Sequence, residues 1–167
     1  MGRVWFFYRN CKKLTLFAKI GLLCYHKTMV EMYSKNANHN MRRPVVKEEV
    51  VSYMRTHQKQ EVGHLRELAD FARQENIPII QPEVVAYFRL LMQTLAPKSI
   101  LEVGTAIGFS ALLMAQYAPQ AKITTLERNE EMLTLARKNL VKYDSRQQIK
   151  LVEGDALDIL PSLEDNY

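Results

Sequence analysis

The feature that most constrains the fold is a regular alternation of short apolar runs and amphipathic segments after residue 98. The apolar runs are rich in β-branched residues and are typical of buried strands. The predicted strands are residues 99–103, 123–127 and 149–152, and the predicted helices are 109–117, 129–143 and 155–160, the last ended by Pro161. Alternating strands and helices pair in parallel through right-handed crossovers. The sequence therefore predicts an α/β fold with a doubly wound parallel sheet, of which three strands are present.

Three further helices are predicted ahead of the first strand. Pro44 opens the first, apolar residues at steps of three and four over 62–72 mark the second, and the third runs from Pro82 to just before Pro97. We expect these helices to cap the sheet. The predicted organisation is a basic and apolar extension outside the core (1–43), cap helices (44–97) and a partial sheet domain (98–167).

The positive charge of the chain is concentrated in the extension. The formal net charge is +5, but residues 1–43 contain nine Lys or Arg and one acid, whereas residues 44–167 contain 14 Lys or Arg and 17 acids. The predicted folded part is thus mildly acidic, so the overall charge is poor support for nucleic-acid binding by this domain.

The extension contains one apolar stretch, residues 14–24, which is about half the length of a membrane-spanning helix and includes Lys19. No small-residue cleavage site follows it. We expect no stable membrane insertion, and interpret the extension as non-native in preference to a surface anchor or an export signal. Cys11 and Cys24 form no metal or disulfide pattern, which fits a cytoplasmic location.

Polar and glycine residues follow each predicted strand, and in an open parallel sheet these strand ends form the ligand site. The candidate binding residues are Glu102, Gly104, Thr105, Gly108, Ser110, Glu127, Asp155 and Ala156. The glycine spacing is G-x-x-x-G, which is neither the dinucleotide nor the Walker pattern, so a pyrophosphate ligand is disfavoured.

These residue types instead suit a ligand with an amino-acid tail, a ribose and an adenine. Glu102 could accept from an ammonium group, and Ser110 with helix N–H groups could donate to a carboxylate. Glu127 suits two ribose hydroxyls, although an acid there also suits a nicotinamide cofactor. Asp155 could accept from an adenine amine or simply cap the helix that follows, and Ser110 could be an ordinary helix-start residue.

Three segments carry a family resemblance: L-E-V-G-T-A-I-G-F-S (101–110), T-T-L-E-R-N (124–129) and V-E-G-D-A (152–156). They resemble the cofactor motifs of the catechol O-methyltransferase-like family, which are class I O-methyltransferases that use S-adenosylmethionine (SAM), and in particular those of bacterial tRNA 5-hydroxyuridine methyltransferases. The resemblance runs from about residue 43 to the last residue. It implies a Rossmann-like methyltransferase fold.

The resemblance also implies residue roles and partners. Glu102, Gly104 and Ser110 would contact the methionine moiety, Glu127 the ribose, and Asp155 with Ala156 the adenine. The acceptor would be 5-hydroxyuridine in tRNA or a small catechol-like hydroxyl compound, and the intact enzyme is expected to be a homodimer.

The catalytic part of the family pattern is not found in this sequence. In the family an Asp-x-x-Lys segment and a later acidic pair hold Mg²⁺ and supply the base. This sequence ends at Tyr167, before those positions. We therefore expect the chain to be C-terminally truncated, with its metal and catalytic residues beyond Tyr167.

The sequence leaves two other classes of protein open. One is a nicotinamide-binding domain, which the absence of G-x-G-x-x-G disfavours. The other is a non-catalytic fragment, since the first predicted strand, 99–103, would lack its neighbour on one edge. We therefore expect the isolated chain to be weakly stable, prone to aggregation and inactive.

Overall fold

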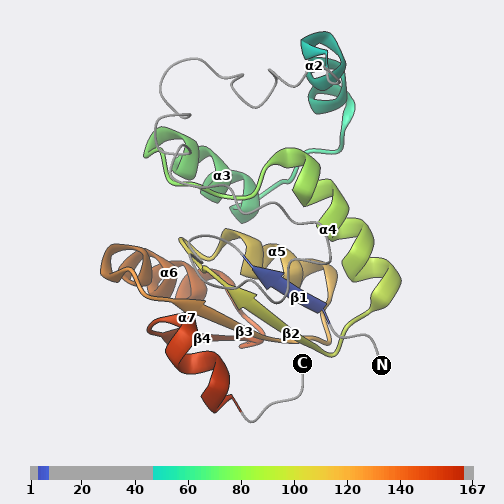
Figure 1. The fold of residues 1–167 in the computed structure, drawn as a ribbon. Helices are drawn as coiled ribbons and strands as arrows, with labels where there is room; N and C mark the ends of the chain where they lie inside the picture. The colour runs from blue at the N-terminus through green and yellow to red at the C-terminus, as the bar shows by residue number, and fades with distance from the viewer. Residues whose placement is uncertain (1–3, 8–46, 164–167) are drawn as a thin grey trace. The chain divides into compact units, whose positions relative to one another are not determined.

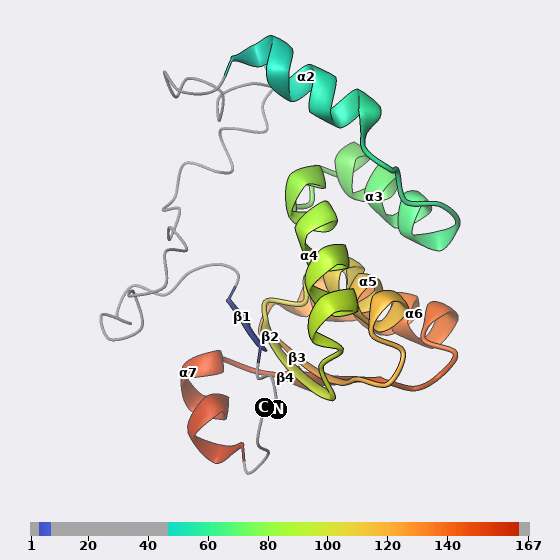
Figure 2. The same ribbon diagram turned by 90° about the vertical axis from the view of Figure 1, so that its right-hand side faces the viewer.

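The computed structural model describes residues 4–7 and 47–163 (Figures 1 and 2). Its strands are β1 (Val4–Phe7), β2 (Ser99–Val103), β3 (Lys122–Glu127) and β4 (Ile149–Glu153). Its helices are α2 (Glu48–His57), α3 (His64–Gln74), α4 (Pro82–Leu95), α5 (Phe109–Tyr117), α6 (Glu130–Tyr143) and α7 (Ala156–Ile159), followed by a 3₁₀ turn, η2 (Leu160–Ser162).

The strands form one parallel sheet in the order β1-β2-β3-β4. The three strands predicted from the sequence are confirmed, and they pair with their neighbours in the predicted parallel sense. The register places Glu102 of β2 opposite Thr125 of β3, and Glu127 opposite Glu153 of β4. Because all strands run the same way, their carboxyl ends meet at one edge of the sheet.

The outer edge of β2 is where the prediction was wrong. We expected this edge to be unpaired and residues 1–43 to lie outside the core, but Val4–Phe7 forms β1 and pairs along it, with Val4 opposite Ile100 and Phe7 opposite Val103. The physical reason is that a strand edge presents unpaired N–H and C=O groups. The segment Val-Trp-Phe-Phe consists of residues that favour strands. By pairing with β2 it provides hydrogen-bond partners for the N–H and C=O groups along that edge.

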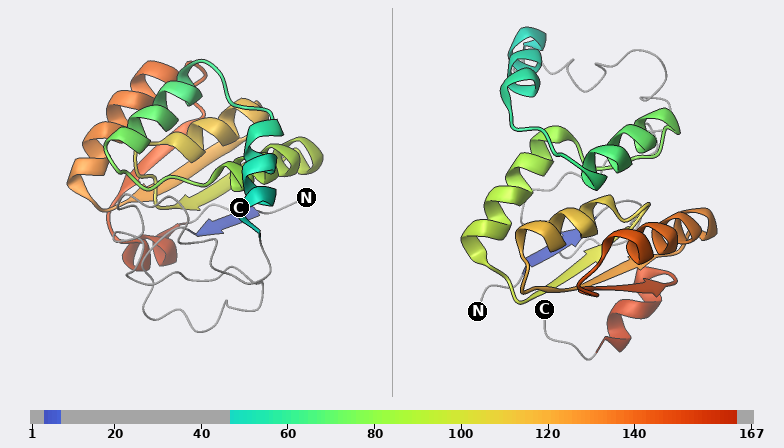
Figure 3. Two further views of the ribbon diagram at one scale, coloured as in Figure 1. Left: turned by 90° about the horizontal axis from the view of Figure 1, so that it is seen from above. Right: turned by 180° about the vertical axis from the view of Figure 1, so that it is seen from behind.

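Helices cover both faces of the sheet, as Figure 3 shows from two directions. Helices α4, α5 and α6 lie on one face, where Ile100 and Ile123 belong to the main core, and α3 packs against α5. On the other face Leu101 and Leu126 are buried beneath α7 and η2. Neighbouring strand residues such as Ile100 and Leu101 thus point to opposite faces of the sheet, which is the period of two that a strand requires.

The predicted helices differ from the observed ones mainly at their ends. The helix expected from Pro44 begins at Glu48, and Pro44 itself lies outside the described residues. Helix α2 belongs to a different compact unit from the sheet, one that ends at Gln58. Pro161 does not stop the last helix outright but lies within η2, where its missing N–H costs no hydrogen bond. Among residues 47–163, no helix combines the length and apolar character needed to cross a membrane.

Several expectations concern the two ends of the chain, where residues lie outside the described ranges. The apolar stretch 14–24 is among them, together with Cys11 and Cys24. Tyr167 also lies outside the described residues, as does the rest of 164–167.

Asn129, the first residue of the predicted helix 129–143, is the N-cap of α6, because its side chain accepts a hydrogen bond from the Met132 N–H at 3.0 Å. We expect Asn129→Ala to lower the free energy of unfolding by about 1 kcal/mol, since a helix N–H loses its partner. Urea unfolding followed by circular dichroism measures this change. The matched variant Lys138→Ala, at an exposed position of the same helix, should change it by less than about 0.5 kcal/mol. Equal effects of the two substitutions would contradict the capping role.

Candidate functional site

The carboxyl ends of β2, β3 and β4 are tied together by backbone hydrogen bonds. The N–H groups of Gly104 and Thr105 both donate to the Leu126 carbonyl, at 2.8 and 3.1 Å, and the Gly154 N–H donates to the Glu127 carbonyl at 2.8 Å. All three predicted motifs therefore meet in one place, as the parallel topology requires.

The loop after β2 has a backbone conformation that requires glycine at two positions. Gly104 and Gly108 have φ angles of 96° and 85°, a region that glycine enters without a steric penalty. At Gly108 an added Cβ would also lie 3.4 Å from the Leu140 Cδ2 atom. Between them Ala106 has φ 48°, an unfavourable conformation for alanine that marks a strained loop.

Glu127 is held at the end of β3 by three backbone donors. Its Oε2 accepts from the Ala106 N–H at 2.9 Å, and its Oε1 accepts from the N–H groups of Arg128 and Asn129 at 2.9 and 3.0 Å. The carboxylate is therefore fixed in orientation while it is only partly buried. A carboxylate has about four acceptor sites, so one remains on Oε2 to accept a hydrogen bond from a ligand hydroxyl.

Glu102 lies in the interior and is only 3% exposed. Its Oε1 accepts from the Ser110 hydroxyl at 2.5 Å and its Oε2 from the Thr125 hydroxyl at 2.6 Å, while Thr125 also shares a 2.7 Å hydrogen bond with Thr105. Burial raises the pKa of Glu102 from 4.5 to about 7, the hydrogen bonds from Ser110 and Thr125 oppose this rise, and the nearby Glu127 adds to it.

Asp155 is both a helix cap and an ion-pair partner. Its Oδ1 accepts from the Leu157 N–H at 2.9 Å, and its Oδ2 accepts from the Arg128 guanidinium at 2.6 Å. These two contacts, the backbone donor first, lower the pKa of Asp155. The capping alternative raised from the sequence is thus confirmed, and the ion pair bridges the ends of β3 and β4.

The structure brings the candidate residues together but changes what some of them do. The Thr105 hydroxyl is buried against Thr125, and the Ser110 hydroxyl donates to Glu102 and so cannot at the same time donate to a ligand. Ala156 is the first residue of α7, where a backbone N–H has no partner within the helix.

Sequence reasoning missed Arg128 and Thr125. Arg128 directly follows Glu127, and Thr125 lies two residues before Glu127 on the same face of β3, so the strand period was the available signal.

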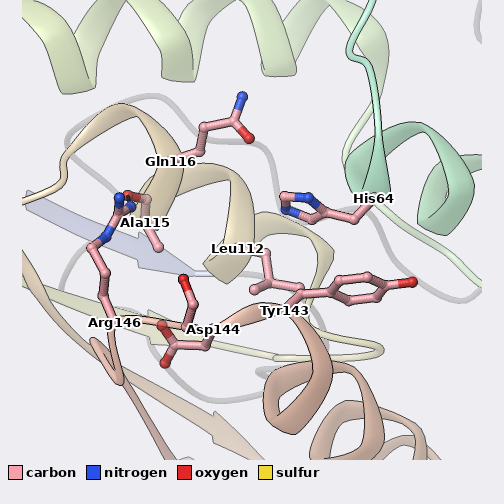
Figure 4. A pocket seen from close by; sticks show the side chains of 8 residues that line it. His64, Leu112, Ala115, Gln116, Tyr143, Asp144 and Arg146 are labelled. Atoms are coloured by element: carbon pink, nitrogen blue, oxygen red, sulfur yellow. Dashed lines mark hydrogen bonds between the residues drawn. The ribbon is translucent and has the colours of Figure 1, made fainter.

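A separate cavity of about 180 Å³ lies near the amino end of β4 (Figure 4). It is lined by His64, Leu112, Ala115, Gln116, Tyr143, Asp144, Ser145 and Arg146. The His64 and Tyr143 rings stack with their centroids 5.0 Å apart, and Arg146 donates to the Ala115 carbonyl. None of the candidate binding residues lines it. In the part of the chain that the structure describes, no three His, Cys, Asp or Glu residues gather in a potential metal site.

The combined features define a Rossmann-like α/β protein with a candidate ligand site at the strand ends. A family model described as O-methyltransferase matches residues 48–167. This match covers more than half of the chain, and the chain therefore belongs to the O-methyltransferase family.

Similar proteins agree with this assignment. A catechol O-methyltransferase of Niastella koreensis is 34% identical over 85 residues, which are 50% of this chain and 38% of that protein. The S-adenosylhomocysteine (SAH)-bound methyltransferase PaMTH1 of Podospora anserina matches with a TM-score of 0.66 and 26% identity, over 71% of this chain and 53% of that one. An O-methyltransferase from Bacillus cereus in complex with SAH matches with a TM-score of 0.61 and 26% identity, over 71% and 56%. The chain thus spans about half or less of these relatives.

Proposed function

We propose that this chain binds SAM at the carboxyl ends of β2, β3 and β4 and serves methyl transfer to a hydroxyl acceptor. The observation that carries the proposal is the Glu127 carboxylate, held by three backbone N–H groups beside the G-x-x-x-G loop. Similar structures with SAH bound support it. When bound, SAM supplies an electrophilic methyl group on a sulfonium.

The residues of this chain would bind and orient that cofactor. Glu127 would accept from a ribose hydroxyl, Glu102 would face the ammonium group, and the left-handed turn at Gly104 and Gly108 would let the backbone approach the ligand. Asp155 and the Ala156 N–H would bind the adenine edge. Holding the methyl donor in a single orientation is how such a site accelerates transfer.

Two acceptor classes follow from different observations. The catechol O-methyltransferases among the relatives favour a small hydroxylated molecule. The motif resemblance in residues 101–156 favours 5-hydroxyuridine in tRNA. Titrating the SAH-bound chain with catechol or with tRNA containing 5-hydroxyuridine separates them by a binding readout that needs no turnover, because only the true acceptor should bind.

The metal, the oligomer and the activity of this chain are further proposals. The described residues present no group of metal ligands. We propose that the intact enzyme is a cytoplasmic homodimer that uses Mg²⁺, and that these 167 residues alone do not transfer methyl groups. Label transfer by the purified chain would overturn the last of these.

Cofactor binding is tested by thermal unfolding with and without SAH. A ligand that binds only the folded state raises the unfolding midpoint. We expect SAH to raise it in the parent chain, and Glu127→Ala to weaken SAH binding by about 10- to 100-fold, since a charged hydrogen-bond acceptor is lost.

The matched variant Glu131→Ala removes an exposed carboxylate four residues away and should keep the parent's shift. NAD⁺ serves as the competing ligand. A cooperative transition that SAH does not shift, or that NAD⁺ shifts instead, would contradict the proposal.

A further inference from the structure

A chain of three hydroxyl groups surrounds the buried carboxyl of Glu102. Ser110 at the start of α5 occupies one oxygen, Thr125 of β3 occupies the other, and Thr105 of the β2–α5 loop contacts Thr125. Thr125 is fully buried, and Thr105 is 1% exposed. The two threonine side chains are therefore shielded from water, and the hydrogen bond between them constrains the one from Thr125 to Glu102.

Which group donates and which accepts in these hydrogen bonds depends on the charge of Glu102. An ionised carboxylate only accepts, so Thr125 must donate to it, and Thr105 must then donate to Thr125. A protonated Glu102 can donate to Thr125 instead, which reverses the order. The two threonines thus complement either state, but they favour the ionised one because hydrogen bonds to a charged acceptor are the stronger kind.

Few charges act on this group. Glu127, at the end of β3, is the neighbouring charge and disfavours ionisation of Glu102. Helix α5, whose sequence is FSALLMAQY, contains no charged residue, and the buried residues of α4 are Val85, Phe88 and Met92. No cation in the described part of the chain is hydrogen-bonded to Glu102, so a ligand cation would supply the missing countercharge.

Resting on the proposed SAM site, we propose that Thr125, supported by Thr105, is a positioning residue that holds the Glu102 carboxylate for the ammonium group of the cofactor. Where Glu102 is protonated in the free chain, the cofactor then binds with release of that proton to solvent. The ammonium keeps its own protons, and the carboxylate changes from neutral to charged as the ion pair forms. Thr125 acts through Glu102 and does not contact the ligand.

The experiment compares two ligands across pH by calorimetric titration of the full chain. SAH carries the ammonium group, whereas 5′-methylthioadenosine has the same adenosine moiety without the amino-acid tail. We expect SAH to bind about tenfold more weakly at pH 6 than at pH 8, because Glu102 must lose its proton near pH 7. The affinity for 5′-methylthioadenosine should stay constant, and buffers of different ionisation heat should show close to one proton released with SAH at pH 6.

Two variants assign the effect to Thr125. Thr125→Val keeps the shape but removes the hydroxyl, and should weaken SAH binding at pH 7 by about tenfold while moving its pH midpoint upward. Thr125→Ser restores the hydroxyl and should rescue both properties. Neither variant should change the affinity for 5′-methylthioadenosine.

The outcomes separate this inference from the proposed function. Binding of neither ligand at any pH contradicts the SAM site itself. Binding of both ligands with the same pH dependence, or equal weakening of both by Thr125→Val, overturns the positioning role and leaves the SAM site in place.

Discussion

Replacing Glu102 by glutamine is expected to raise the free energy of unfolding at pH 8 by up to about 3 kcal/mol. Glu102 is 3% exposed, and its pKa rises from 4.5 to about 7 on burial. Since one unit of pKa corresponds to about 1.36 kcal/mol, a rise from 4.5 to about 7 means that keeping this group ionised in the folded chain costs roughly 3 kcal/mol. Glutamine has nearly the same shape and no charge, so it removes the cost.

The sign of the pH dependence follows from the direction of the shift. Between pH 4.5 and about 7 the folded chain binds a proton at Glu102 that the unfolded chain has lost. The parent should therefore become less stable as pH rises through this range, by the contribution of this one group, and level off above it. Below pH 4.5 Glu102 is protonated in both the folded and the unfolded chain, so it no longer makes the free energy of unfolding depend on pH.

Urea unfolding of the parent and Glu102→Gln at several pH values measures the difference. We expect the two chains to converge near pH 4.5 and to diverge up to pH 8. Glu131→Gln, at an exposed site, should follow the parent at every pH. A glutamine variant that is less stable than the parent at pH 8 would show that the hydroxyls around Glu102 stabilise the charge more than burial opposes it.

This substitution also separates stability from binding. A buried carboxylate that destabilises the fold persists only where another property requires it, and functional sites are where such costs concentrate. Glu102→Gln should accordingly weaken SAH binding while it strengthens the fold. A gain in both would indicate that Glu102 has no role toward the cofactor.

The second large effect is expected in the core, at Leu113 of α5. Its side chain is 0% exposed and lies in the main cluster between the sheet and the cap helices. Leu113→Ala removes three buried carbon atoms and leaves a cavity that close packing cannot fill, which typically costs about 2–5 kcal/mol. We expect a loss of about 3 kcal/mol, a large fraction of the stability of an ordinary domain.

Urea unfolding again provides the measurement, with Leu90→Ala as the matched control. Leu90 lies on α4 with 61% of its surface exposed, so the same chemical change there should alter the free energy of unfolding by less than about 0.5 kcal/mol. Similar losses at both positions would mean that α5 is not the centre of the core. A chain that unfolds without a cooperative transition before any substitution would confirm the expectation of weak stability.

The elements and the candidate site could be predicted because both depend on local patterns. Strands β2, β3 and β4 are short apolar runs, and the helices between them repeat apolar residues at steps of three and four. Once parallel strands are expected, topology alone brings their carboxyl ends together. Glu102, Glu127 and Asp155 could therefore be assigned to one site without coordinates.

Partners distant in the chain could not be predicted in this way. Val4–Phe7 pairs with β2 across roughly 90 residues of chain, and no local signal in a short apolar segment specifies which edge it will join. Arg128 reaches Asp155 through a side chain whose direction depends on packing.

The sequence by itself determined the parallel α/β architecture and the residue types that gather at the strand ends, because secondary-structure period and chain direction are properties of the chain alone. Only the tertiary structure decided the state of those residues. Burial raises the pKa of Glu102, Thr125 and Ser110 occupy its oxygens, and three backbone donors orient Glu127. Desolvation and hydrogen-bond geometry arise from neighbours in space, which the order of residues does not state.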